Sequence, residues 1–187
     1  MKSHFKLLFT TAPIMSLLTA CDRAPDAQRE QQARPASSVA IQTPESIAIE
    51  HGELHEALAG MAAEPGEMAA AARDLERALA PHFKREEQIA TPPLGLLPAL
   101  AKGDATAEMR SILPMTDALE RELPQMLREH EVIRRALTKF RTAAERNGRQ
   151  DYMRFAANLA AHAREEEEIL YPAAIVVGRY VKRTAPK

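Results

Sequence analysis

The feature that most constrains the fold is a pattern of histidine, glutamate and apolar residues that occurs twice. Residues 50–58 and 129–137 share the pattern E-H-x-x-[LI]-x-x-A-L. Residues 82–92 and 162–172 share the pattern H-x-x-x-E-E-x-I-x-x-P. In the first copy the histidines that mark the two patterns lie 31 residues apart, and in the second copy they lie 32 apart. A two-helix unit is therefore present twice, which predicts a bundle with approximate internal two-fold symmetry.

The composition favours helices throughout the part of the chain that carries this pattern. Aromatic residues make up only 4% and Trp is absent, whereas the strong helix formers Ala, Leu, Glu and Arg dominate after residue 45. We predict an all-α, up-down four-helix bundle with helices over residues 44–63, 67–90, 124–146 and 150–171. One or two short helices are expected within residues 94–123. Whether the last long helix continues past its proline is left open.

Helix geometry brings the repeated polar residues together. Residues four positions apart are rotated by only about 40° around an α-helix, so the histidine and glutamate of each H-x-x-x-E pair share one face. The remaining two helices each add one imidazole. A mixed set of nitrogen and oxygen ligands without thiolates suits iron, manganese or zinc, and two carboxylates shared among four imidazoles suit a dinuclear centre. The candidate metal ligands are His51, His82, Glu86, His130, His162 and Glu166.

These motifs resemble those of the hemerythrin-like family, also called the cation-binding HHE domain. The resemblance covers residues 46–180 and rests on four histidines in the expected order, two H-x-x-x-E pairs and a proline after each pair. It implies a non-haem centre of two iron ions bridged by an oxo or hydroxo group and by both glutamates, Glu86 and Glu166. It also implies that the first two histidines hold one iron and the last two hold the other. Zinc and manganese are the alternative metals.

One histidine departs from the pattern of the hemerythrins that carry dioxygen. Those proteins have a further histidine four residues after the one on the third helix, where this chain has Arg134. Here the extra histidine is His55, four residues after His51. It is either a fifth imidazole ligand or a residue outside the ligand set. The last acidic ligand is a glutamate, with Glu165 as the fallback, where oxygen carriers use aspartate. Both differences weaken the interpretation as a plain oxygen carrier.

Other polar residues near the candidate ligands are expected to lie outside the ligand set. Glu87 and Glu167 are expected to face water or to support hydrogen bonds to the ligands. Glu50 and Glu129 lie about 100° around the helix from the adjacent histidine, which directs them away from the metal. For Tyr171, a packing role is favoured over a position one or two turns beyond the metal.

The N-terminal residues are typical of an export signal. Two lysines precede an apolar run over residues 7–18 that is too short to span a membrane, so residues 1–20 are predicted to be a signal peptide. The run ends Leu-Thr-Ala-Cys, which resembles a bacterial lipobox and makes Cys21, the only cysteine, the expected lipidation site. An ordinary signal peptide with an incidental cysteine is the alternative.

The remaining chain divides into a tether and a domain. Residues 21–43 are rich in Ala, Gln, Arg, Pro and Ser and are predicted to form a flexible tether, and residues 44–181 form the hemerythrin-like domain. Asp22 after the cysteine favours the periplasmic face of the inner membrane, with the outer membrane as the alternative. We expect the chain to contact the membrane through the lipid anchor only. The net charge of -1 does not suggest binding to nucleic acid.

The sequence therefore predicts an exported metal-binding protein. The leading hypothesis is a di-iron protein that binds or senses dioxygen or nitric oxide, or that handles iron itself. Oxidase or peroxidase activity is the alternative, and whether the protein is an enzyme is left undecided. A zinc-binding or metal-free structural lipoprotein is the second alternative.

Overall fold

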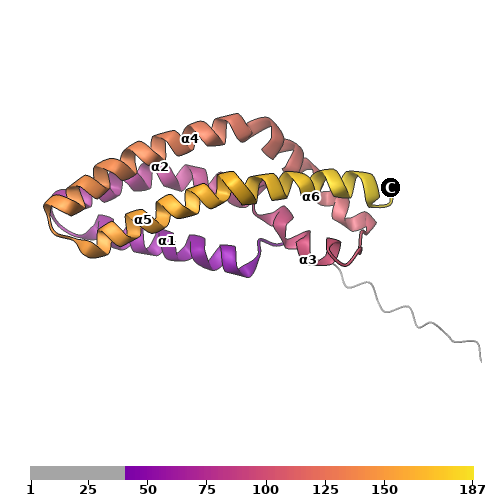
Figure 1. Cartoon of the computed structure of the whole chain (residues 1–187), viewed down its shortest axis with the longest axis horizontal. Coiled ribbons are helices and arrows are strands. Elements are labelled where there is room, and N and C mark those ends of the chain that lie inside the picture. Colours follow the sequence, from indigo (N-terminus) through magenta and orange to yellow (C-terminus); the bar gives the residue numbers. More distant parts are fainter. Residues whose placement is uncertain (1–40) are drawn as a thin grey trace, which may run out of the picture. The chain divides into compact units, whose positions relative to one another are not determined.

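The computed structural model of the protein describes residues 41–187, and every regular element among them is a helix (Figure 1). This confirms the all-α prediction. η1 and η2 are 3₁₀-helices and η3 is a π-helical turn. The elements are α1 (Glu45–Ala63), α2 (Glu67–Ile89), η1 (Pro92–Leu96), α3 (Leu97–Leu100), η2 (Ala107–Ile112), α4 (Leu113–Arg146), α5 (Gln150–Glu165), η3 (Glu166–Leu170) and α6 (Tyr171–Thr184).

The predicted signal peptide, Cys21 and nearly all of the predicted tether lie outside the described residues. Within the part that the structure describes, no helix is long and apolar enough to cross a membrane.

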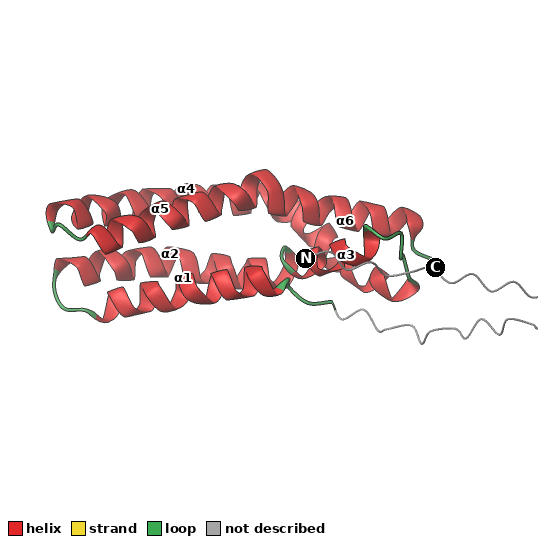
Figure 2. Cartoon of the chain, turned by 60° about the horizontal axis from the view of Figure 1, so that its bottom comes forward, coloured by secondary structure: helices red, strands yellow, loops and turns green. Residues whose placement is uncertain are grey.

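The bundle consists of α1, α2, α4 and α5, with α6 prolonging α5 (Figure 2). The turn that joins α1 to α2 and the turn that joins α4 to α5 lie at the same end (Figure 1). Gly66 and Gly148 lie in these turns with φ of 97° and 65°, a conformation that costs glycine little because it has no Cβ. At the other end, α6 packs against α4, η1 and η2. The architecture is the predicted up-down four-helix bundle.

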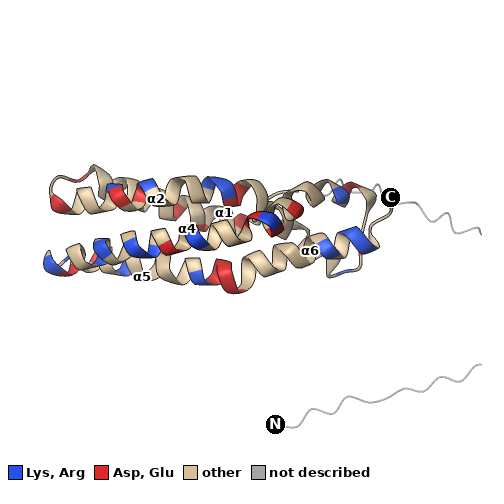
Figure 3. Cartoon of the chain, turned by 90° about the horizontal axis from the view of Figure 1, so that it is seen from above, with Lys and Arg blue, Asp and Glu red and all other residues tan. Residues whose placement is uncertain are grey.

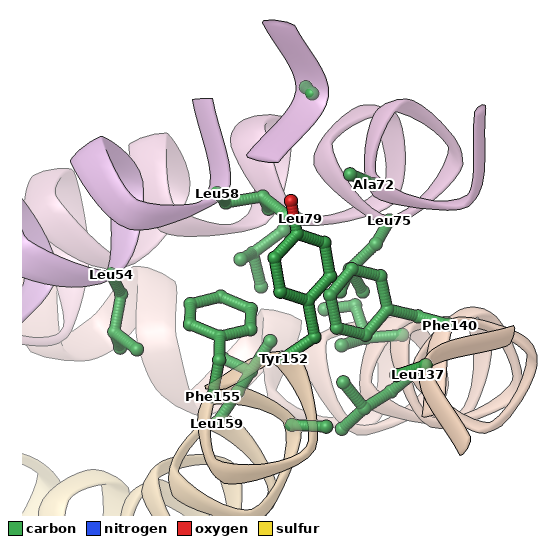
Figure 4. Close-up of a cluster of buried hydrophobic side chains, with 14 of the residues drawn as sticks. Leu54, Leu58, Ala72, Leu75, Leu79, Leu137, Phe140, Tyr152, Phe155 and Leu159 are labelled. Atoms are coloured by element: carbon green, nitrogen blue, oxygen red, sulfur yellow. The ribbon is translucent and has the colours of Figure 1, made fainter. Parts of the chain in front are cut away.

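Two apolar clusters fill the bundle on either side of a polar layer. The larger cluster lies towards the two turns, where leucines and aromatic rings from all four helices interdigitate (Figure 4). The smaller one includes Ile89, Leu119 and Met126 and continues into α6. Burying a side chain of this size contributes about 1.5–3 kcal/mol, so the clusters carry much of the stability of the fold. The candidate ligands lie between them along each helix.

The third long helix begins at Leu113 and not at residue 124, so its predicted start was wrong. Pro114 lies in the first turn, where a missing N–H group needs no partner, whereas Pro124 lies inside the helix. The early turns of α4 are held by α6. Gly178 faces Thr116 so closely that an added Cβ would lie 2.2 Å from the threonine Oγ1. This tertiary packing outweighs the local cost of the internal proline.

Both copies of the repeat contain a backbone hydrogen bond that spans five residues, as in a π-helix, and that begins at the ligand glutamate. The N–H group of Tyr171 donates to the carbonyl of Glu166, five residues earlier. The N–H group of Thr91 donates to the carbonyl of Glu86 in the same way, at 3.1 Å. A proline without an N–H group follows in each copy. The chain nevertheless remains helical past the second proline as far as Thr184, which answers the question that the sequence left open.

Candidate metal centre

The six candidate ligands meet in the polar layer of the bundle. One comes from α1, two from α2, one from α4, one from α5 and one from the first position of η3. None is more than 3% exposed: His51, His82, Glu86, His130, His162 and Glu166. Histidine and glutamate are rarely buried this completely without a partner that offsets their polarity.

These residues form two groups with ligand spacing, and Glu166 belongs to both. In each group one nitrogen or oxygen atom per residue lies within 4.8 Å of the others. His82, Glu86 and His130 complete the first group with Glu166. The second group consists of Glu166 with one histidine each from α1 and α5, His51 and His162.

The pairing of the histidines differs from what the resemblance implied. The structure pairs His82 with His130, whose Nε2 atoms lie 2.7 Å apart, and His51 with His162, whose ring centroids lie 5.0 Å apart. The reason is that α2 packs closely along α4, so their histidines meet across that contact. In addition, Glu166 alone is shared by both groups, whereas Glu86 belongs only to the first.

Several buried ligand atoms have no hydrogen-bond partner in the protein. They are both ring nitrogens of His51 and of His162, Oε2 of Glu86 and Oε1 of Glu166. His162 Nε2 lies 2.7 Å from Glu166 Oε1, yet the two are not oriented as a hydrogen bond. Two polar atoms that approach closely without facing each other fit ligands directed at a shared third atom. The residues present therefore fit a bound cation, which would satisfy atoms that otherwise cost free energy.

Without a cation, protons balance the charge of the cluster. Burial disfavours the charged form of His82, but its contacts with Glu86 and Glu129 outweigh burial and raise its pKa to about 9. Burial likewise opposes protonation of His162, and the contact with Glu166 outweighs it and raises the pKa of that histidine to about 9. Burial raises the pKa of Glu86. Burial acts in the same direction on Glu166, but the surrounding histidines hold its pKa well below the usual value. A bound cation would replace these protons.

Each of the four imidazoles has a carboxylate on its outer side. On α2 and α4, His82 Nδ1 lies 2.9 Å from Glu129 Oε2, and His130 Nδ1 lies 2.6 Å from Glu167 Oε1. A carboxylate at Nδ1 fixes which ring nitrogen carries the proton, so Nε2 is left to face the centre.

Carboxylates also lie near the Nδ1 atoms on the other side of the internal two-fold, although no hydrogen bond forms there. His162 Nδ1 lies 3.1 Å from Glu50 Oε1, and His51 Nδ1 lies 3.9 Å from Glu87 Oε1. The acid before each histidine of α1 and α4 thus faces a histidine of the partner hairpin. The acid after each ligand glutamate faces a histidine of its own hairpin. All four acids lie outside both ligand groups, in agreement with the sequence-based expectation.

Tyr171 is the residue of the centre that the sequence analysis missed. Its side chain is 1% exposed, its hydroxyl donates a hydrogen bond to Glu86 Oε1, and it lies 3.2–3.3 Å from Nε2 of both His82 and His130. In a regular α-helix a residue five positions after Glu166 would point about 140° away. The π-helical turn changes this angle and brings the phenol to the first ligand group, so its hydroxyl contacts ligands in addition to the packing that the sequence favoured.

The two remaining candidates lie away from the ligand atoms. His55 is exposed, belongs to neither group and packs edge-on against Phe83, with ring centroids 4.9 Å apart. Glu165, the fallback ligand, is also exposed. At the position equivalent to His55, Arg134 donates a hydrogen bond of 2.8 Å to Glu167, which holds His130.

Taken together, the fold and the site define a helical-bundle protein with a buried cation site built from histidines and glutamates. The family model of the hemerythrin HHE cation binding domain matches residues 45–174, more than half of the chain. The chain therefore belongs to this family. No curated protein and no solved structure matches it.

The shared carboxylate of Glu166 provides the first test of the site. We expect Glu166→Gln to lower the cation content of both groups, because the variant keeps the shape of the side chain but removes the charge that both groups use. The measurement is elemental analysis of the purified chain after loading, with circular dichroism to confirm that the bundle is folded. Glu168→Gln, an exposed neighbour, is the matched control and should retain full content. Equal metal content in the two variants would contradict the assignment.

The hydroxyl of Tyr171 provides the second test. Tyr171→Phe keeps the ring that lies against His130 but removes the donor to Glu86. Loss of a group that orients a ligand typically costs about 10–100-fold in metal affinity, and we expect a loss in that range by competition with a chelator. Tyr152→Phe, in the apolar cluster ten residues before His162, should leave the affinity unchanged. If both variants bind as tightly as the unaltered chain, Tyr171 has only a packing role.

Proposed function

We propose that this chain is a non-haem di-iron protein whose two ligand groups hold one iron each and share Glu166. The single observation that supports this most is the pair of buried groups with a common carboxylate. Imidazole and carboxylate ligands suit iron, and a shared carboxylate offsets the charge of two neighbouring cations. Zinc and manganese accept the same ligand types and are the alternatives that the experiment must separate.

We further propose that the centre binds or senses dioxygen or nitric oxide, or handles iron itself. Two adjacent iron ions, when bound, would supply a redox-active centre for small diatomic ligands. The contribution of the chain is to enclose this centre: apolar clusters lie on both sides of the ligand layer, and all six ligands are nearly inaccessible. An enclosure of this kind admits small ligands and keeps bulk water away from the ligand atoms. Tyr171 adds one hydroxyl donor to the first group.

The location of this centre is proposed from the N-terminal sequence. The apolar run before Cys21 and the Leu-Thr-Ala-Cys sequence support export and lipidation of the chain. The protein would then act on the periplasmic face of the membrane, with the lipid anchor as its membrane contact.

The decisive experiment for the metal is elemental analysis of the purified chain after anaerobic reconstitution with ferrous iron. The expected content is about two irons per chain, because the structure has two ligand groups. An absorption spectrum of the oxidised protein, and spectra of the reduced protein with dioxygen and with nitric oxide, then test small-ligand binding. Iron content near zero after reconstitution, or preferential retention of zinc, would rule out the di-iron proposal. Full iron content without any spectral response to either gas would favour iron handling.

The lipid anchor has its own test in Cys21→Ser. We expect the unaltered chain, expressed in a bacterium with radiolabelled palmitate, to take up the label and to fractionate with membranes. The variant should take up no label, because the thiol is the only one in the chain. Labelling of both proteins, or of neither, would contradict lipidation at this residue.

A further inference from the structure

We propose that a groove between α1 and α5 is the path by which a divalent cation reaches the centre. The groove has a volume of about 410 Å³ and is here called the α1/α5 groove. Its lining includes three carboxylates, two apolar side chains and one ligand: Glu50, Glu53, Glu165, Leu54, Phe155 and His162. The inference rests on the proposed function only in that the centre takes up a cation.

The floor of the groove reaches a ligand of the second group. His162 is 3% exposed, its two ring nitrogens have no hydrogen-bond partner, and it lines the groove. The groove therefore ends on an unsatisfied ligand rather than on a closed apolar surface. Its acidic character and its buried end are independent observations, and both suit a cation.

The walls of the groove carry three carboxylates, Glu50, Glu53 and Glu165. None of the residues that line it is a lysine or an arginine. Glu53 and Glu165 are exposed at its rim, and Glu165 begins the acidic run of four glutamates visible at the junction of α5 and η3 (Figure 3). Glu50 is about half exposed and lies 3.1 Å from His162 Nδ1, so it connects the rim with the ligand. A cleft lined by one sign of charge raises the local concentration of the opposite ion.

The equivalent seam in the other half of the molecule is closed. The internal two-fold relates the contact of α1 with α5 to the contact of α4 with α2, which pack closely along their length. Inside that seam, His82 and His130 lie 2.7 Å apart and Tyr171 fills the space beside them. Outside it, Arg85 donates to Glu122 at 2.7 Å and bridges the two helices.

A second groove, between α4 and α5, lacks the features of an entrance for a cation. It has a volume of about 440 Å³, but its charged lining residues are Arg134 and Arg141 and none of the six ligands lines it. Of the two grooves, the one between α1 and α5 combines negative charge with access to a ligand.

The test compares rates of cation uptake at equal final content. The double variant Glu53→Gln/Glu165→Gln removes two rim charges without touching any of the six ligands. Metal-free full-length chain is mixed with ferrous iron without oxygen, uptake is stopped with a chelator at intervals, and bound metal is measured. We expect the uptake rate to fall about tenfold, within the range typical of electrostatic steering, with the final content unchanged. Rising salt should slow the unaltered chain more than the variant.

Matched variants separate the groove from net charge. Glu56→Gln/Glu168→Gln changes net charge equally at exposed positions outside the groove and should leave the rate unchanged. Asn158→Asp adds a carboxylate to the groove lining and should speed uptake. Equal rates in the two double variants would overturn the proposal.

The same series with zinc separates the proposed entry path from the proposed di-iron function. A chain that takes up zinc but no iron contradicts the di-iron function, while the zinc uptake rates still decide the role of the groove. A chain that takes up neither ion overturns both.

Discussion

The interior of this protein depends on a layer of six buried polar side chains that satisfy one another only in part. Leaving a buried polar group without a partner costs about 1–3 kcal/mol, and six ligand atoms of the layer are in that position. The apolar clusters on both sides supply the burial free energy that holds these side chains in place. Binding a cation would satisfy the same atoms, so cation affinity and stability of the bundle are coupled through this layer.

The outer carboxylates extend this constraint to the surface of the bundle. Each imidazole lies between the centre and a glutamate, so negative charge surrounds the ligands from outside as well as from within. These glutamates are partly exposed and therefore cost little to keep ionised, while they favour a cation over a neutral interior. The internal repeat explains why four separate residues do this: Glu50 and Glu129 occupy one equivalent position, and Glu87 and Glu167 the other.

The sequence predicted the bundle and the ligand residues because both follow from local spacing. An H-x-x-x-E pair shares a helix face wherever the helix lies, and two copies of a hairpin suffice to define an up-down bundle. The pairing of the histidines depends on which helices pack most closely, which spacing does not specify. The start of α4 depends on packing between Thr116 and Gly178, and the position of Tyr171 on a π-helical turn. The spacing of residues along the sequence does not specify these tertiary and backbone effects.

The two halves share a backbone plan, yet their differences define the chemistry of the centre. Five residues after the ligand glutamate, one copy has Thr91 and the other Tyr171, and only the tyrosine hydroxyl reaches a ligand group. The phenol and the close contact of α2 with α4 fill one seam, which leaves the equivalent seam between α1 and α5 as the open one. A perfectly symmetric bundle would have either two such openings or none. Divergence of the repeat therefore separates a closed group with a hydroxyl donor from a group that faces an acidic groove.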